Sequence, residues 1–179
     1  IMRNRVNHVI DADIKGFFDN VSHEWMLEFL RVRIVDPSFL LLVQRFLKAG
    51  YMDSGLLVPT DRGTPQGGNL SPILSNIFLH YVLDLWFNRR VKRQVRGGCF
   101  LVRYADDFVC LLQYQEEARY VAEQLRERFA EFDLQLHPEK TRVISFGRYE
   151  RENARRQKRR AHTFDFLGFT HYCGRSRTG

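Results

Sequence analysis

The sequence predicts an α+β domain in which an antiparallel β-sheet carries helices packed on one face. Segments with strand and helix periodicity follow the order β-α-β-β-α-β once insertions are set aside, which is the order of a ferredoxin-like core. The 179 residues are 44% hydrophobic, which suffices for one core. Two adjacent aspartates interrupt the apolar run at 100–112, as expected for the tip of a hairpin.

The first third of the chain is expected to form one strand and two helices. Residues 6–14 contain apolar and β-branched side chains and end in acids, which is typical of a strand. Residues 22–34 have helical periodicity, with Ser22 as the N-cap. A second helix is expected over 36–50, where a proline lies near the start and a glycine at the end.

A turn-rich segment and a long helix come next. Residues 51–69 are rich in turn formers and end in "RGTPQGGN". We expect a long helix over 70–90, with Ser71 as the N-cap and Pro72 at the first helical position. Such a helix is long enough to cover one face of a small sheet.

The second half of the chain should supply the rest of the sheet. The hairpin around the two aspartates is followed by an amphipathic helix over 116–132. Two further strands are expected over 141–146 and 163–171. In a β-α-β-β-α-β sheet the first strand lies in the middle, beside the hairpin.

The positive charge is concentrated in two segments. The net charge is +7, and residues 89–96 and 148–160 each contribute +5, so the rest of the chain is acidic overall. This pattern suits a polyanion, most commonly nucleic acid, although two solvated surface loops would look the same. The Arg-rich segment, about 148–162, is expected to be a mobile loop.

Other protein classes find little support. The chain has no apolar run of bilayer length and begins without the apolar stretch of a signal peptide, so we expect a cytoplasmic protein with no membrane partner. Cys99, Cys110 and Cys173 are odd in number and widely spaced, which indicates reduced thiols and neither disulfides nor a zinc site.

The paired acids Asp106 and Asp107 need a neutralising partner. Antiparallel topology brings the hairpin tip to the same end of the sheet as Asp13, at the end of the first strand. Clustered carboxylates repel one another and suit hard cations such as Mg²⁺ or Mn²⁺. Two such ions can activate a hydroxyl and stabilise a leaving pyrophosphate. A plain polar turn remains the alternative, because Asp favours turns.

Four motifs in this order resemble the palm of a reverse transcriptase, most of all those encoded by bacterial group II introns. They are "ADIKGFFDNVSHEWML" (12–27), "GTPQGGNLSPILSNIFLHYVLD" (63–84), "RYADDFV" (103–109) and "FDFLGFTH" (164–171). A weaker fifth motif, "LQLHPEKTRVISF", occupies 134–146. The resemblance covers nearly the whole chain, and it implies a polymerase palm fold.

The resemblance also implies a set of metal ligands. Asp13 and Asp106 would be the principal ligands of two Mg²⁺ ions, with Mn²⁺ as a substitute, and Asp107 an auxiliary one. The backbone carbonyl of Ile14 would complete one metal's shell. Only motif register selects Asp13 over its neighbours Asp11 and Asp19.

Further roles carry over to residues around the acids. Phe18 would lie beneath the sugar and exclude ribonucleotides sterically, while Gln66 and Gly67 would lie under the nucleotide and template. Lys140 would approach the triphosphate and donate a proton to the leaving pyrophosphate, although an exposed loop lysine fits equally well.

Nucleic-acid contacts are expected at two places. Three residues would grip the 3′ end of the primer: Leu167, Gly168 and Phe169. The basic segments would contact nucleic-acid backbones through Arg89, Arg90, Lys92, Arg93, Arg155, Arg156, Lys158, Arg159 and Arg160.

The implied function is RNA-directed DNA synthesis by one palm domain over 1–179. Fingers before the first motif and a thumb after the last are expected to be largely absent, which would leave apolar surface for self-association and the isolated fragment incomplete. The expected partners are an RNA template, a DNA or RNA primer, deoxynucleoside triphosphates and intron RNA. Two alternatives stay open: a defence- or CRISPR-associated reverse transcriptase, and a non-catalytic RNA-binding splicing cofactor with the palm fold.

Overall fold

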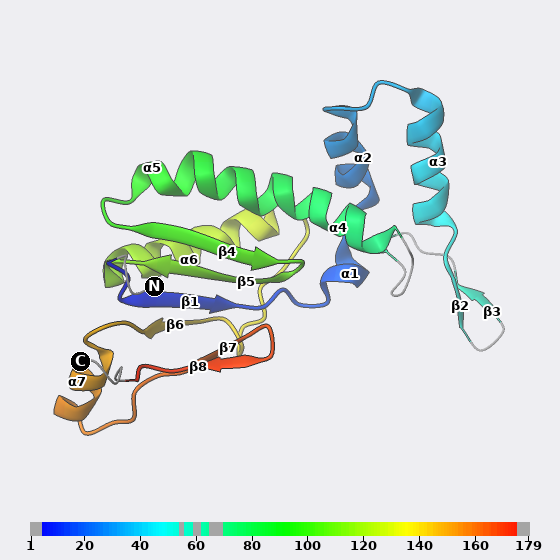
Figure 1. The fold of residues 1–179 in the computed structure, drawn as a ribbon. Coiled ribbons are helices and arrows are strands. Elements are labelled where there is room, and N and C mark those ends of the chain that lie inside the picture. The colour runs from blue at the N-terminus through cyan, green and yellow to red at the C-terminus, as the bar shows by residue number, and fades with distance from the viewer. Residues whose placement is uncertain (1–4, 54–55, 59–61, 65–69, 175–179) are drawn as a thin grey trace.

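A four-stranded antiparallel sheet forms the centre of the molecule (Figure 1). The computed structural model describes residues 5–53, 56–58, 62–64 and 70–174. In spatial order the strands are β4 (Cys99–Tyr104), β5 (Asp107–Leu112), β1 (His8–Ala12) and β6 (Arg142–Ser145). The first strand pairs with β5 on one side and β6 on the other, so its predicted place in the middle of the sheet is confirmed.

Short helices follow β1 and lead away from the sheet. These are α1 (Phe17–Asn20), α2 (His23–Arg31) and α3 (Pro37–Lys48). The Ser22 hydroxyl accepts the Trp25 N–H at 3.4 Å, as predicted for the N-cap of α2. In Figure 1, α2 and α3 project beyond the sheet, and a small hairpin of β2 (Tyr51–Asp53) and β3 (Leu56–Val58) follows them within the predicted turn-rich segment.

One long helical segment lies along the sheet and contains two π-helical stretches. It consists of α4 (Ser71–Leu79), η1 (His80–Asp84), η2 (Phe87–Val91) and α5 (Lys92–Gln94). The prediction of Ser71 as N-cap is wrong: Leu70 takes that position, and Ser71 is the first helical residue and buried. Leu70 already has a helical backbone (φ −89°, ψ −22°), so the helix starts one residue earlier than predicted and Pro72 is its second residue instead of its first.

The π-helical turns keep the apolar side chains of this helix on one face. Leu83, Phe87 and Val91 are all buried and lie four residues apart. In an α-helix that spacing drifts by about 40° per step, and the wider π turn absorbs the drift. Arg128 of α6 (Gln115–Ala130) donates to the carbonyls of Val82 at 3.0 Å and Tyr81 at 3.3 Å, which ties the two helices together.

The sheet separates two apolar cores. On one face, Ile10 and Phe108 pack with the long helix and α6 in the main core. On the other face, Val9 and Val109 pack in a smaller core with Phe164. Side chains of a strand alternate between faces, so Asp11 and Asp107 share the face of the smaller core.

The last predicted strand is a hairpin instead. Residues 163–171 form β7 (Phe164–Phe166) and β8 (Phe169–His171), which pair antiparallel. Leu167 and Gly168 between them have φ values of 54° and 76°. Two successive positive φ values are typical of a tight hairpin turn, which reverses the chain in the middle of the "FDFLGFTH" motif.

The Arg-rich segment was predicted to be a mobile loop. It contains helix α7 (Glu150–Arg156) instead. Glu150 in its first turn is buried, with its side chain 1% exposed. Its carboxylate accepts hydrogen bonds from Arg159 at 2.5 Å and from the backbone N–H of His162 at 3.1 Å. Burial alone would raise the pKa of Glu150, but these hydrogen bonds outweigh it and hold the pKa below its usual value.

The described helices include none that is long and apolar enough to span a bilayer. The three cysteines are free thiols, as expected; Cys99 and Cys110 are buried and Cys173 is half-buried.

Candidate active site

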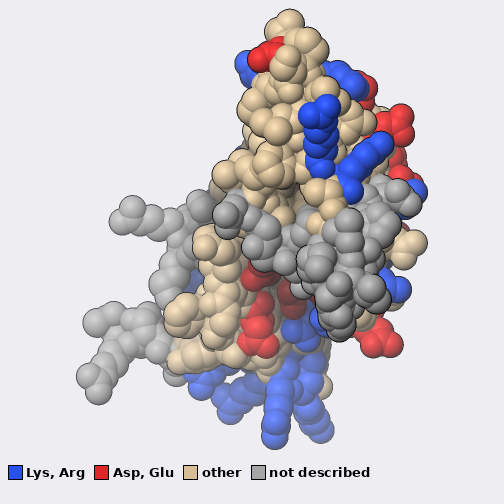
Figure 2. Space-filling model, turned by 90° about the vertical axis from the view of Figure 1, so that its right-hand side faces the viewer, with Lys and Arg blue, Asp and Glu red and all other residues tan. Residues whose placement is uncertain are grey.

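The predicted acids meet at one end of the sheet. Ala12 of β1 pairs with Phe108 of β5, so Asp13 follows β1 where Asp107 begins β5. Tyr104 pairs with Asp107, which leaves Ala105 and Asp106 as the two turn residues of the hairpin. Figure 2 looks onto this end, where acidic side chains occupy the centre and basic ones project below them. The structure therefore brings Asp13, Asp106 and Asp107 to neighbouring positions.

The hairpin turn is held by a side chain that the sequence reasoning missed. Arg103 pairs with Asp84 of the long helix through two hydrogen bonds, Nε to Oδ1 at 2.8 Å and Nη2 to Oδ2 at 2.6 Å. Its Nη1 donates to the Ala105 carbonyl at 2.7 Å and to Asn76 at 2.9 Å. Ala105 has a φ of 52°, a backbone region that disfavours a residue with a Cβ. Arg103 thus joins the strained turn to the helix above it.

Asp13 is engaged by Lys140. The Lys140 Nζ lies 3.1 Å from Asp13 Oδ2, and both side chains are about half exposed or more, 65% and 49%. The segment that leads into β6 is anchored here, since the His137 N–H donates to the Asp13 carbonyl at 2.7 Å. Lys140, predicted to act near the triphosphate, therefore lies at the acids themselves.

The Ile14 carbonyl is the fourth predicted metal ligand. Ile14 forms an isolated β-bridge with Leu136. The carbonyls that accept hydrogen bonds at this bridge are those of Asp13 and Gln135, not that of Ile14. Within the described ranges, no hydrogen bond to the Ile14 carbonyl is found. A backbone carbonyl oxygen directly after Asp13 is a suitable ligand for a hard cation.

Asp11 is occupied elsewhere. It pairs in register with Arg142 of β6, and Arg142 donates to its carboxylate at 3.1 Å. Burial raises the pKa of Asp11, the Arg142 hydrogen bond opposes that rise, and the nearby charges of Asp107 and Asp165 add to it. Asp11 therefore belongs to an ion pair beside the predicted metal ligands, while Asp19 is exposed in α1.

The β7–β8 turn contacts the acids directly. The Leu167 N–H donates to Asp107 Oδ2 at 3.2 Å. The side chains of Leu167 and Phe169 are exposed. The three residues predicted to grip a primer thus lie beside the predicted metal ligands.

Phe18 is half-buried and packs against the main core, 5.4 Å from the ring of Phe17. Its carbonyl accepts the Thr64 N–H at 2.7 Å, so residues 62–64 dock on α1. A Cβ at Gly63 would come within 2.6 Å of that carbonyl, which explains the glycine. The predicted nucleotide-binding residues Gln66 and Gly67 lie outside the described residues.

The donor chemistry fits a divalent cation. Carboxylates and a backbone carbonyl are the oxygen ligands that Mg²⁺ prefers. In the described part of the chain no three His, Cys, Asp or Glu side chains converge into a ready-made metal cage. Two of the acids already have other partners, Lys140 at Asp13 and the Leu167 N–H at Asp107.

The predicted nucleic-acid residues divide between two sides of the molecule. Arg89, Arg90, Lys92 and Arg93 are exposed on the long helix, above the sheet in Figure 1. The α7 segment lies below it, near β7 and β8. Its exposed members are Arg155, Arg156, Lys158 and Arg160, whereas Arg159 is pinned to Glu150.

Comparison with known proteins gives consistent matches. A family model described as reverse transcriptase (RNA-dependent DNA polymerase) matches residues 2–171. Protein YkfC of Escherichia coli (strain K12) is 32% identical over 168 residues, covering 75% of this chain and 42% of that protein. The group II intron-encoded protein LtrA of Lactococcus lactis subsp. cremoris is 32% identical over 150 residues, covering 78% and 25%. The chain thus spans less than half the length of both relatives.

Solved structures share the fold. Apo telomerase from Candida tropicalis, truncated from the C-terminal domain, superposes with a TM-score of 0.66 at 16% identity, over 94% of this chain and 34% of that chain. Telomerase from Candida albicans in complex with a fragment of telomeric RNA gives 0.64 at 15% identity, over 91% and 29%. At this identity the likeness shows the α+β fold alone.

Proposed function

The chain belongs to the reverse transcriptase (RNA-dependent DNA polymerase) family, and from that premise we propose that residues 1–179 act as the palm domain of an RNA-directed DNA polymerase. One observation carries the proposal: Asp13 and Asp107 flank the last paired residues of two neighbouring strands, with Asp106 in the adjoining turn. Carboxylates on stiff adjacent strands suit a reaction that needs fixed charge.

The residues proposed to hold two Mg²⁺ ions, with Mn²⁺ as a substitute, are Asp13, Asp106, Asp107 and the Ile14 carbonyl. When bound, the ions would activate the primer 3′-hydroxyl and stabilise the departing pyrophosphate. The chain itself positions these ligands: β1 and β5 fix Asp13 and Asp107, and Arg103 fixes the turn that carries Asp106.

Other residues would handle the substrates. Lys140, already at Asp13, would release that carboxylate and donate a proton to the pyrophosphate. Phe18 would exclude ribonucleotides, and Gln66 and Gly67 would support the nucleotide. The β7–β8 turn would hold the primer end through Leu167, Gly168 and Phe169, next to Asp107.

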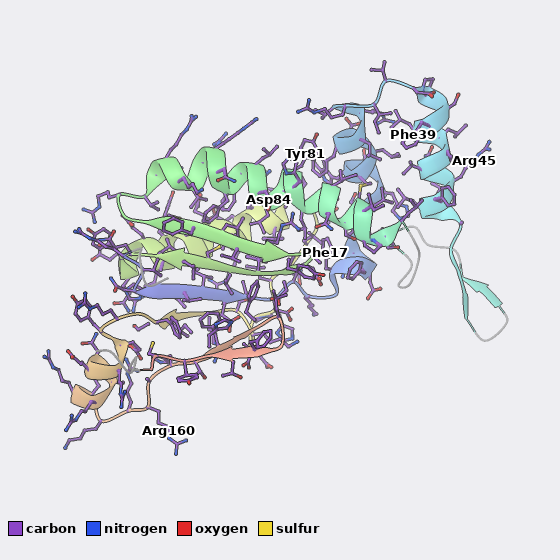
Figure 3. All side chains as sticks on the ribbon, in the orientation of Figure 1. Phe17, Phe39, Arg45, Tyr81, Asp84 and Arg160 are labelled. Carbon is purple, nitrogen blue, oxygen red and sulfur yellow. The ribbon has the colours of Figure 1, made fainter. Side chains whose placement is uncertain are left out.

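The α7 segment would bind the phosphate backbone of the template–primer duplex. It lies below the sheet, as the β7–β8 hairpin does (Figure 1), and Arg160 projects from it (Figure 3). Arg155, Arg156, Lys158 and Arg160 are exposed. No ion pair engages these four within the described residues. Unpaired arginines suit phosphate oxygens.

The similarity to a group II intron-encoded protein supports a role in intron mobility and splicing. The partners would be an RNA template, a DNA or RNA primer, deoxynucleoside triphosphates and intron RNA. We place the protein in the cytoplasm, consistent with three free thiols, and expect self-association through exposed apolar side chains of α3. A defence-associated polymerase would share this palm.

Primer extension on an RNA template tests the proposal. Asp106→Asn should lower extension by more than about a hundredfold, because it removes a ligand charge. Asp165→Asn is the matched control, since Asp165 is exposed on β7 near the acids and bonds Thr170. Equal extension by wild type and Asp106→Asn would refute the assignment.

A second readout covers a chain that does not extend primers alone. Mn²⁺ binding, followed by electron paramagnetic resonance, should be lost in Asp106→Asn and kept in Asp165→Asn. A wild-type chain that binds RNA but no Mn²⁺ would instead support the non-catalytic splicing cofactor.

A further inference from the structure

A groove lies on the helical side of the molecule, away from the acids. Its volume is about 370 Å³, and we call it the helix-face groove. Residues of the long helix and of α6 line it: Tyr81, Leu85, Trp86, Arg89, Arg90, Arg128 and Glu131. Figure 3 shows Tyr81 on the upper side of the molecule and Arg160 of the α7 segment on the lower side.

The groove is positively charged. Arg89 and Arg90 are exposed, and neither forms an ion pair with any described residue. Lys92 and Arg93 extend the charge along the same helix. The nearest acid on the lining, Glu131, is neutralised by Arg128 at 2.7 Å. Two free guanidinium groups therefore remain at the rim.

The groove is lined by two aromatic side chains, Tyr81 and Trp86, which are held in place. The Tyr81 ring stacks on Phe29 with centroids 4.8 Å apart and an interplanar angle of 12°. Trp86 is half-buried and packs against the main core. Arg128 is fixed by the carbonyls of Tyr81 and Val82, and its guanidinium lies 4.3 Å from the Phe132 ring centroid. These side chains need little ordering when a ligand binds.

This combination suits unpaired bases more than a duplex. Aromatic rings and arginine planes in a concave site accept splayed-out bases, and free guanidinium groups bind the flanking phosphates. A duplex would present only its backbone to a groove of this size. The charged rim lacks the exposed apolar face that a lipid surface would need.

We propose that the helix-face groove binds an unpaired segment of RNA, at a site separate from the template–primer site. The proposal deepens the proposed function by assigning RNA to a second surface. Because the groove and the α7 segment lie on opposite sides of the sheet, one protein molecule should hold a single-stranded RNA and a template–primer duplex together.

Fluorescence anisotropy with two probes tests this on the whole chain, without metal or nucleotides. The probes are a labelled single-stranded RNA 10-mer and a blunt RNA–DNA duplex. Arg89→Gln/Arg90→Gln should weaken binding of the single strand about tenfold and leave duplex binding within about twofold. The matched control, Arg155→Gln/Arg156→Gln on α7, removes the same charge and should do the reverse.

Trp86→Leu adds a test of stacking. It should weaken the single strand about fivefold or more without changing net charge. Its thermal unfolding is compared with wild type, because Trp86 also packs against the core. If it unfolds early, Arg89→Gln/Arg90→Gln decides alone, since both side chains are exposed.

Three results would overturn the inference. These are equal weakening of both probes by both arginine pairs, displacement of the single strand by saturating duplex, and equally tight binding of a polyglutamate peptide at the same ionic strength. Failure of the proposed function looks different: duplex binding would be absent in wild type, while the single strand still bound and still depended on Arg89 and Arg90.

Discussion

Arg103 shows how one side chain can support a strained turn. It is 13% exposed and bonds Asp84, Asn76 and the Ala105 carbonyl at once. Asp84 lies on the long helix above β4 (Figure 3). Removing either Arg103 or Asp84 should be costly, because the residue that remains would keep a largely buried charge with no opposite charge beside it.

Arg103→Met should therefore lower the free energy of unfolding by about 2–4 kcal/mol. Asp84→Leu should cost a similar amount, and the double variant should cost less than the sum of the two. Urea unfolding of the three variants and wild type measures the coupling. Strictly additive costs would mean that the ion pair contributes nothing of its own.

Leu167 is a second strained residue, with a φ of 54° and its N–H on Asp107. Asparagine tolerates this left-handed region better than leucine. Leu167→Asn should raise the free energy of unfolding by about 0.5–1 kcal/mol, measured by thermal unfolding. Leu167→Ala keeps the strain and serves as the control; a stability gain for Ala equal to that for Asn would contradict this reason.

At the residue scale, the sequence predicted the acids but not what holds them. Asp13, Asp106 and Asp107 could be found because the motifs and the strand order both point to one end of the sheet. The partners Lys140 for Asp13 and Asp84 for Arg103 depend on side-chain reach across elements, which spacing does not give. An arginine inside the apolar run "CFLVRY" was the available signal for Arg103.

At the scale of elements, α7 depends on Glu150. The segment reads as low-complexity and basic, so composition alone predicted a mobile loop. One buried carboxylate with bonds from Arg159 and His162 orders it instead. Periodicity gave the approximate positions of the other long helices and of the sheet strands, but not α1 or the β2–β3 hairpin. Within 163–171, periodicity predicted one strand, and only the family resemblance indicated a Gly-containing turn, because Leu167 does not favour positive φ.

Glu150→Gln should cost about 2–4 kcal/mol, since it removes the buried negative charge that pairs with Arg159. Glu152→Gln, on the exposed side of the same helix, should cost less than about 0.5 kcal/mol. Urea unfolding at pH 7 gives both values. Equal costs would mean that position in α7, and not burial, governs the effect.

The Glu150–Arg159 ion pair predicts that the stability of the protein depends on pH. Because the folded state holds the pKa of Glu150 below its unfolded value, its contribution to stability is present above the unfolded pKa, near 4.5, and is lost as pH falls through the folded pKa. Stability of wild type should therefore fall below about pH 4.5 more steeply than that of Glu150→Gln. Unfolding curves from pH 6 to 3 measure it, and parallel curves would contradict it.

At the scale of the whole molecule, the sheet divides the protein into two working sides. The primer turn, which contacts Asp107, and α7 both lie below the sheet, at its opposite ends, and the helix-face groove lies on the helical side. The sequence predicted that β1 lies in the middle of the sheet beside the β4–β5 hairpin, because few topologies fit the element order. It was wrong to assign 163–171 to the same sheet, because β7 and β8 form a two-stranded sheet of their own. The sequence could not show that the two basic segments lie on opposite sides of the sheet, since a run of charged residues does not indicate which face of the fold it occupies.

The thiols report the integrity of the two cores. Burial raises the pKa of Cys99 to about 11 and that of Cys110 well above its usual value, and burial also raises that of Cys173. Thiol labelling at pH 8 should therefore be slow in the native protein, and Cys110 should react only through unfolding. In urea all three should label quickly. Rapid native labelling of Cys110 would show that the main core is open.

The two π-helical turns, His80–Asp84 and Phe87–Val91, have an evolutionary consequence. Each accommodates about one residue beyond an α-helical turn, so deleting a residue there would leave an intact and even more regular helix. The residues after the deletion would keep their orientation, because the wide turn had absorbed the extra residue. Related proteins with a single-residue gap within His80–Asp84 should therefore still keep the residues at the positions of Arg89 and Arg90 beside that of Tyr81, without any change at Asp106.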